Sequence, residues 1–228
     1  MSDQAGSTDL ARSYESASEI LAERDPVLRR LAAVAGPPVI SLPAADHFGA
    51  LVRAIVYQQL AGAAASAIHG RLVAAAGGEV APERLLSLPE ETLRAAGLSG
   101  RKAATIRDLS AKIMDGTVTL DPAGLSSQSD DEIVARLSSV KGIGTWTAQM
   151  FLMFQLGRLD VWPTGDLGVR KGFALAWAIP TPTPKQLDPL GDPYRPYRSV
   201  LAWYCWRAAE LYGGARESVL TGGEGSRA

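Results

Sequence analysis

The sequence is poor in the residues that build metal centres and covalent cross-links. Its 228 residues include one cysteine, Cys205, and two histidines. A single cysteine excludes an internal disulfide framework, a cysteine-built zinc site and a four-cysteine iron–sulfur cluster. Stability must therefore come from a hydrophobic core, which a composition of 46% hydrophobic and 21% charged residues supports.

Long apolar runs are also missing. None reaches the roughly 20 residues that a membrane-spanning helix needs, and no secretory signal opens the chain. We expect a cytoplasmic protein, associated with the nucleoid if the source is bacterial, with no membrane partner. Strand-type alternation of apolar and polar residues is lacking as well, whereas helical spacing recurs, which predicts an all-α fold.

The chain has no excess of either charge. Its formal net charge is −1 and its pI is about 6.2, a balance that argues mildly against a nucleic-acid partner. The distribution is more informative, because segments 97–113 and 194–216 each hold four basic residues against one acidic residue. A polarised surface is one interpretation, and solvated charges on separate helix faces are the other.

Glycine and proline divide the chain into short helical segments. Helices are predicted over 9–23, from 26 to a break at 36–38, and over 46–60, 63–76, 82–88, 89–96, 103–114, 129–138, 145–156, 167–178 and 196–213. Segments 121–129 and 180–193 are expected to be loops. We expect one helical domain over 9–213, with a disordered segment 1–8 before it and a flexible tail 214–228 after it.

The stretch around which the chain is organised begins with a glycine hairpin within 137–149. Gly142 and Gly144 are separated by one apolar residue, which permits a tight turn with positive φ and leaves the backbone bare. The helix restarts at once, and Thr145 is a suitable N-cap. Exposed N–H groups at such a helix start favour an anion such as a phosphate, while plain apolar packing is the alternative explanation.

One carboxylate follows this hairpin at a distinctive position. Asp166 comes twenty-two residues after Gly144, inside the sequence Pro-Thr-Gly-Asp-Leu-Gly at 163–168. Flanking proline and glycine place it at a loop-to-helix junction rather than on a helix face. It is therefore a candidate catalytic acid group, a helix N-cap, or both.

The pattern L-x-x-V-x-G-I-G-x-W-T-A at 137–148, followed by D-V-W-P-x-G-D-L-G at 160–168, resembles the helix-hairpin-helix superfamily of DNA glycosylases. Within it, the pattern is similar to the 3-methyladenine DNA glycosylase II branch, and the likeness extends over about 48–212. The resemblance implies an all-α fold whose two helical lobes flank an active-site cleft. It also implies a role in base excision repair of alkylation damage, with damaged double-stranded DNA as the partner.

The resemblance further implies how the reaction would run. Asp166 matches the catalytic aspartate of the family, which stabilises the positively charged sugar as the N-glycosidic bond breaks. Bifunctional relatives place a Schiff-base lysine just after the hairpin, where this chain has Trp146 close by. We therefore expect a monofunctional hydrolase that uses water and requires no cofactor. The hairpin of this superfamily often binds a monovalent cation, and the matching carbonyls are those of Ser138, Val140 and Ile143.

The remaining candidate residues fall into three groups. The duplex wedge is assigned to Gln58 and Gln59 with Leu60 as support, although a polar C-terminal turn would explain the glutamines too. The base pocket is assigned to aromatic and thioether side chains: Trp146, Met150, Trp162, Trp203 and Trp206. Contacts to phosphate are assigned to residues of the hairpin and of one basic helix start: Lys141, Gly142, Gly144, Thr145, Arg101 and Lys102.

Each assignment has an alternative. Any one aromatic in a helical protein is more often packed in the core than exposed in a pocket, and the turn at Arg101 and Lys102 could be merely exposed. Met150 stands where some relatives place a tyrosine, so the breadth of substrates stays open. A noncatalytic helix-hairpin-helix DNA-binding module and a glycosylase for deaminated or oxidised bases are the competing functions. We expect a monomer.

Overall fold

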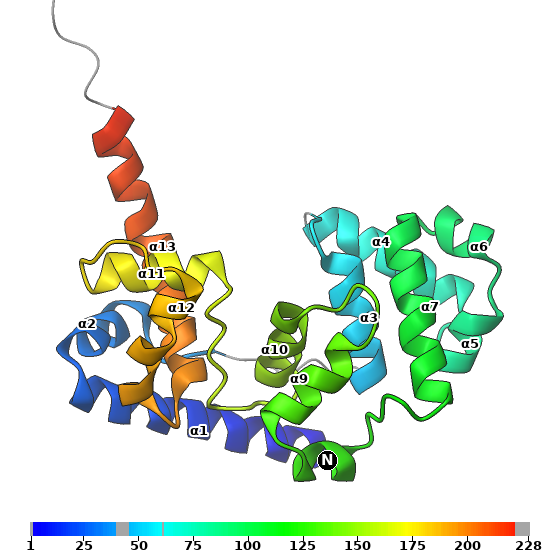
Figure 1. The fold of residues 1–228 in the computed structure, drawn as a ribbon, viewed down its shortest axis with the longest axis horizontal. Coiled ribbons are helices and arrows are strands. Elements are labelled where there is room, and N and C mark those ends of the chain that lie inside the picture. The colour runs from blue at the N-terminus through cyan, green and yellow to red at the C-terminus, as the bar shows by residue number, and fades with distance from the viewer. Residues whose placement is uncertain (1, 40–45, 61, 222–228) are drawn as a thin grey trace, which may run out of the picture. The chain divides into compact units, whose positions relative to one another are not determined.

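The computed structural model describes residues 2–39, 46–60 and 62–221, and side chains within 10–213 of these ranges. Every regular element of this described part is a helix, which confirms the predicted all-α fold (Figure 1). Within the same residues, no helix combines the length and the apolar character that crossing a membrane requires.

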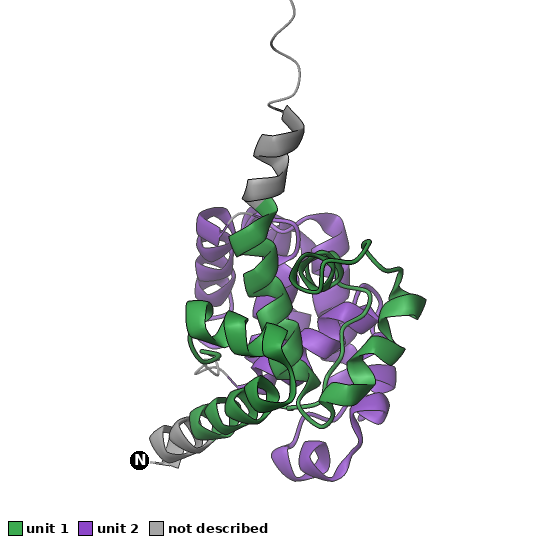
Figure 2. Ribbon diagram, turned by 90° about the vertical axis from the view of Figure 1, so that its left-hand side faces the viewer, with its two compact units in different colours: residues 1–42, 156–228 green, residues 43–155 purple. Residues whose placement is uncertain are grey.

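The chain forms two compact units, and the second is inserted into the first (Figure 2). Unit 1 comprises residues 1–42 and 156–228, and unit 2 comprises residues 43–155. The predicted glycine hairpin therefore belongs to unit 2, and Asp166 belongs to unit 1. The two units are described separately below.

Unit 2 consists of eight helices within the described residues. They are α3 (His47–Tyr57), α4 (Gly62–Ala75), α5 (Pro82–Ser87), α6 (Glu90–Ala95), α7 (Gly100–Met114), α8 (Pro122–Ser127), α9 (Asp130–Ser138) and α10 (Thr145–Phe154). Its core is formed by aliphatic side chains that are at most 1% exposed, among them Leu51, Val52 and Ile55 of α3 and Ile106 and Leu109 of α7. These residues recur at helical spacing in the sequence, so each amphipathic helix buries its apolar side.

Helix α8 lies where a loop was predicted over 121–129, so that prediction was wrong. Asp121 caps the helix by accepting a hydrogen bond from the Gly124 N–H at 2.6 Å, and Pro122 occupies the first turn. Leu125 is buried. A capping residue, an N-terminal proline and one buried apolar side chain suffice for a short helix.

Unit 1 contains α1 (Ser2–Arg24), α2 (Pro26–Ala35), α11 (Leu167–Ala176), α12 (Pro184–Leu187), a 3₁₀ helix η1 (Pro189–Tyr194) and α13 (Arg198–Thr221). The predicted loop over 180–193 is thus largely helical, because Thr183 forms a capping box with Gln186 at the start of α12.

Both outer helices are longer than predicted. Helix α1 begins at Ser2 rather than near residue 9, and α13 ends at Thr221 rather than near residue 213. Much of the expected disordered segment 1–8 and of the tail 214–228 is therefore helical, since extending an established helix costs far less than nucleating one. Residues 1 and 222–228 lie outside the described part, and flexibility of the two ends stays a prediction.

Helices α11 and α13 pack side by side at unusually close range (Figure 1). A Cβ atom added at Gly172 of α11 would stand 1.7 Å from the carbonyl oxygen of Cys205 in α13, so only glycine fits there. Complete burial raises the pKa of the Cys205 thiol, which makes it a packing residue and not a reactive one.

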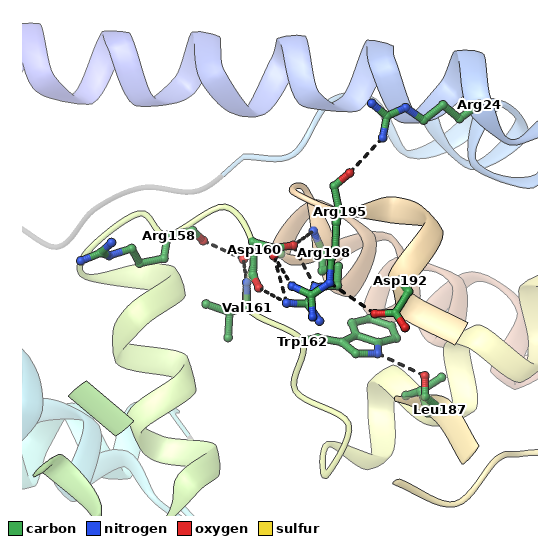
Figure 3. Close-up of polar contacts among 10 residues, drawn as sticks. Arg24, Arg158, Asp160, Val161, Trp162, Leu187, Asp192, Arg195 and Arg198 are labelled. Carbon is green, nitrogen blue, oxygen red and sulfur yellow. Dashed lines mark hydrogen bonds and ion pairs between the residues drawn. The ribbon is translucent and has the colours of Figure 1, made fainter. Parts of the chain in front are cut away.

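A cluster of polar contacts fixes the segment that leads to Asp166 (Figure 3). The Asp160 carboxylate accepts hydrogen bonds from Arg198 Nε at 2.8 Å and Nη2 at 2.9 Å, and from Arg195 Nη1 at 2.8 Å. Ser199 Oγ donates to the Arg158 carbonyl at 2.6 Å and accepts from the Val161 N–H at 2.9 Å. These bonds hold residues 158–161 against the start of α13.

The two arginines that bind Asp160 differ in exposure, which gives a matched test. The Arg198 side chain is 11% exposed and that of Arg195 is 53% exposed. We expect Arg198→Ala to lower the free energy of unfolding by about 1–3 kcal/mol, because Asp160 keeps Arg195 but loses its more buried partner and two hydrogen bonds. Arg195→Ala should cost about 1 kcal/mol or less. Urea denaturation measures both, and equal losses would contradict this assignment.

Candidate functional site

The glycine hairpin joins α9 to α10 in unit 2. Gly142 has a φ of +93°, and a Cβ atom there would lie 2.1 Å from Thr105 Oγ1 of α7. The N-cap of α10 is Gly144 and not the predicted Thr145, which is the first helical residue. The reason is conformational, since Gly144 is still extended while its carbonyl already accepts the hydrogen bond from the Ala148 N–H.

The N-cap of α10, Gly144, has no side chain that could cap the helix. The backbone of the hairpin is therefore uncovered at the point where α10 begins. Gly142, Gly144 and Thr145 are all exposed, and so is the side chain of Lys141. This geometry supports the predicted phosphate contact through main-chain amides.

Helix α7 supports this hairpin with three residues on one of its faces, a feature that the sequence analysis missed. Asp108 Oδ2 accepts a hydrogen bond from the Lys141 N–H at 2.7 Å, and Thr105 lies against Gly142. Lys112 donates to the Ser139 carbonyl and pairs with Asp108 at 3.2 Å. The i, i+3, i+7 spacing of Thr105, Asp108 and Lys112 is the signal that could have indicated a shared face.

Most of the basic residues at 97–113 bind protein carbonyls. Lys102 Nζ donates to the carbonyl oxygens of Val56 and Gln58, both at 2.7 Å, and burial lowers the pKa of this amine. Arg107 Nη1 donates to the Leu88 carbonyl at 2.8 Å. Lys102 thus binds carbonyls within the protein, whereas Arg101 is exposed. A phosphate contact of either residue stays a prediction.

The second basic stretch, at 194–216, is also largely neutralised within the described residues. Arg195 and Arg198 bind Asp160, and Arg207 pairs with Glu210. The basic residues of both stretches are therefore better described as solvated or paired within the protein than as parts of a broad basic surface.

A pocket of about 520 Å³ opens on unit 2 between the end of α3 and the start of α10. It is lined by Ala54, Tyr57, Gln58, Gln59, Trp146, Thr147 and Met150. The structure thus brings together two predicted wedge residues and two predicted pocket residues. Tyr57 was not predicted, although its place one residue before Gln58 was a usable signal. Trp146 is 47% exposed.

The two glutamines differ in what they contact. Gln58 Nε2 donates to Thr147 Oγ1 at 3.3 Å, which ties it to the wall of the pocket. Gln59 has a φ of +56°, a conformation that residues other than glycine seldom adopt, and its side chain is exposed. Leu60 follows and is 39% exposed. Gln59 and Leu60 therefore form a projecting tip at the rim of the pocket, whereas the side chain of Gln58 is tied to the pocket wall.

Asp166 of unit 1 is the N-cap of α11. Its Oδ1 accepts hydrogen bonds from the Val169 N–H at 2.8 Å and from Trp206 Nε1 at 3.0 Å. Gly168 makes the second bond feasible, because a Cβ atom there would lie 2.9 Å from the indole ring of Trp206. The carboxylate is partly exposed, and two N–H groups fix its direction. The structure therefore confirms the capping role, which is compatible with a catalytic one.

Comparison with known proteins decides the family. The model of the HhH-GPD superfamily, described as base excision DNA repair proteins, matches residues 52–193. This chain belongs to the HhH-GPD superfamily. The matched residues run from α3 to η1, so they include the pocket, the hairpin and Asp166.

Individual relatives agree with this assignment. The chain is 32% identical to DNA-3-methyladenine glycosylase 1 of Schizosaccharomyces pombe over 177 residues, which cover 76% of this chain and 77% of the relative. The S. pombe 3-methyladenine DNA glycosylase Mag1, solved in complex with abasic DNA, superposes with a TM-score of 0.75 at 31% identity and covers 86% and 97% of the two chains. A DNA-3-methyladenine glycosidase from Bacillus halodurans gives a TM-score of 0.76 at 35% identity, covering 87% and 93%.

The other predicted pocket aromatics of this HhH-GPD chain lie in unit 1 and have structural partners there. Trp162 is 6% exposed and donates from Nε1 to the Leu187 carbonyl at 3.2 Å (Figure 3), a position that favours the packing alternative. Trp206 holds Asp166. Trp203 is half-buried and packs edge-on against Tyr204, with ring centroids 5.1 Å apart.

A side-chain metal centre is not found in the described residues, where no three histidine, cysteine or carboxylate side chains gather. A monovalent cation on the hairpin would bind main-chain carbonyls instead, at Ser138, Val140 and Ile143. Of these, the Val140 carbonyl accepts a hydrogen bond from the Ile143 N–H at 3.0 Å, which closes the turn. Cation binding by this HhH-GPD hairpin stays a prediction.

The two hairpin glycines should respond differently to alanine. Gly142→Ala adds a side chain at positive φ and against Thr105, so we expect a loss of about 1–3 kcal/mol in the free energy of unfolding. Gly144 has a negative φ and open space around it, so Gly144→Ala should change stability by about 0.5 kcal/mol or less. Denaturant unfolding compares them, and a Gly142→Ala protein as stable as wild type would refute the packing argument.

Proposed function

We propose that this protein is a monofunctional DNA glycosylase that excises alkylated purines of the 3-methyladenine and 7-methylguanine type. The observation that carries the proposal is the Asp166 carboxylate, held by two N–H donors at the loop-to-helix junction expected for the catalytic acid group. The name of the S. pombe relative, a DNA-3-methyladenine glycosylase, supports the choice of substrate class.

Excision begins with access to a bond that lies inside the base stack. The target nucleotide must rotate out of the duplex, and this exposes its orphaned partner base. The projecting tip of Gln59 and Leu60 has the position and exposure to enter the gap. Main-chain N–H groups at the start of α10 would meanwhile hold a backbone phosphate, a contact without sequence preference.

The pocket beside this tip suits a flat, electron-poor ring. Trp146 is 47% exposed and lines the pocket together with Tyr57 and Met150, whose side chains are polarisable. An alkylated purine of this type carries a positive charge, which an electron-rich aromatic face attracts. Selection would then rest on stacking and charge more than on a fixed set of hydrogen bonds.

The chemical step is hydrolysis of the N-glycosidic bond. As the base leaves, the sugar develops positive charge, which a nearby carboxylate stabilises. Asp166 supplies this group and directs the attack of water on C1′. A cationic base is a good leaving group, so no strong general acid is required. The first turn of α10 holds no lysine, which accords with a glycosylase that forms no Schiff base.

The same proposal covers the setting of the reaction. We infer that the enzyme acts as a monomer on damaged double-stranded DNA, in the cytoplasm or on a bacterial nucleoid. It needs no cofactor for hydrolysis.

Replacement of Asp166 by asparagine tests the proposal directly. Asparagine caps helices as well as aspartate does, so the fold should survive. Release of labelled 3-methyladenine and 7-methylguanine from methylated DNA should fall by about 100-fold or more, because the developing positive charge loses its counter-charge. Asp121→Asn, at the N-cap of α8, is the matched control and should release base at the wild-type rate.

The outcomes separate the candidate functions. Equal release by wild type and Asp166→Asn would remove Asp166 from the mechanism. No release by wild type, together with retained DNA binding, would favour a noncatalytic module. Duplexes that contain hypoxanthine, 8-oxoguanine or 1,N6-ethenoadenine complete the panel, and preferential release of one of these would overturn the alkylpurine assignment.

Trp206 offers a second test, because it acts on Asp166 through one atom. Trp206→Phe keeps a large aromatic ring but removes the Nε1 donor, so the carboxylate loses a bond that directs it. We expect the turnover number to fall by about 10- to 100-fold with little change in DNA affinity. Single-turnover excision and fluorescence anisotropy measure the two quantities. A wild-type turnover number would show that the bond from Trp206 does not orient the carboxylate.

A further inference from the structure

Lys102 makes two hydrogen bonds that phosphate binding does not explain. Its ammonium group donates to the carbonyl oxygens of Val56 and Gln58, each at 2.7 Å. These carbonyls lie at the carboxyl end of α3, where a helix leaves its last acceptors without internal partners and carries partial negative charge. A lysine from the first turn of α7 thus closes the end of a helix that lies 46 residues earlier in the chain.

The segment held by these bonds is the turn that carries the projecting tip. Gln58 is the C-cap of α3, and the next residue, Gln59, stands at a φ of +56°. A non-glycine residue in this region costs about 1 kcal/mol or more and persists only where its surroundings impose it. Both contacts act on Gln58, the residue just before Gln59: Lys102 binds its carbonyl oxygen, and its side chain donates from Nε2 to Thr147 Oγ1.

We propose that Lys102 is a positioning residue for base extrusion, which it serves by fixing the turn that presents Gln59 and Leu60 to the duplex. The proposal rests on the proposed glycosylase function. It adds Lys102 as a residue that affects the reaction through Gln59 and Leu60. The ammonium is partly buried and already directed at two carbonyls. The cation left for the DNA backbone at this helix start is its exposed neighbour, Arg101.

Substitution of the two neighbours by methionine separates these roles, since each change removes one positive charge and keeps an unbranched side chain. Lys102→Met should lower the single-turnover rate of 7-methylguanine excision from duplex DNA by about 10- to 100-fold, with the salt dependence of DNA binding unchanged. Arg101→Met should instead weaken binding and reduce the slope of log K against log salt by about one. A Lys102→Met protein that loses affinity and salt slope in the same way would show a phosphate contact and overturn the proposal.

A double-mutant cycle asks whether Lys102 works through the tip. If it does, Lys102→Met should have little further effect on the excision rate once Gln59→Ala has removed the plug, so the two losses should not add. Additive losses would mean that Lys102 affects the reaction by some other route. General destabilisation is expected to give that additive result.

Chemical rescue covers the case in which Lys102→Met folds poorly. Cys205 is fully buried, so in Lys102→Cys the introduced thiol is the accessible one for aminoethylation, which restores an ammonium at nearly the same reach. The unmodified variant should be slow and the modified one should recover most of the wild-type rate. Failure to recover would overturn the proposal. Absence of base release by the wild-type protein itself would instead refute the proposed glycosylase function.

Discussion

The main-chain groups at the ends of short helices need partners, and in unit 2 a single helix supplies many of them. Side chains of α7 donate to carbonyls at the ends of three other helices: Lys102 at α3, Arg107 at α5 and Lys112 at α9. Asp108 accepts from the hairpin amide of Lys141. A helix end that lacks such a partner costs about 1–3 kcal/mol per buried group. The pocket and the hairpin are both built on helix ends, so their shape depends on α7, which itself carries little of the proposed chemistry.

Unit 1 meets the same need with carboxylates, and here structure and chemistry share a residue. Asp25 caps α2 and also accepts hydrogen bonds from Trp177 and Tyr194. Asp160 connects the segment before Asp166 to the start of α13, because it accepts a hydrogen bond from the Arg198 N–H. Asp166 caps α11 in the same manner and is likewise partly exposed. A capping carboxylate is held rigidly by bonds that the fold requires in any case. A short-lived sugar cation is best stabilised by a negative charge that is already held in place. The capping bonds hold the Asp166 carboxylate in this way without further supporting residues.

The sequence predicted local features well and partners distant in the chain poorly. The all-α fold, the hairpin and the junction at Asp166 follow from glycine, proline and helical spacing, which are properties of neighbouring residues. The role of Lys102 could not be predicted, since a lysine at a helix start looks the same whether it meets a phosphate or a carbonyl 46 residues away. Trp206 was assigned to the base pocket, although its indole N–H binds Asp166. Helix α8 was missed because caps and one buried leucine, not a long apolar stripe, stabilise it.

The formal net charge of −1 means that this chain, although assigned to DNA repair, has no excess of cations. A cation that is paired with a carboxylate, such as Arg198 with Asp160, adds little to a long-range field. In the proposed function, attraction to the duplex then falls to the exposed backbone of the hairpin and to exposed cations such as Arg101 and Lys141. When a protein neutralises few phosphates, few counterions are released on binding, so its non-specific affinity for DNA is modest. An enzyme that must leave undamaged DNA quickly, and that gains further contacts once a base is extruded into its pocket, has reason to keep that affinity low.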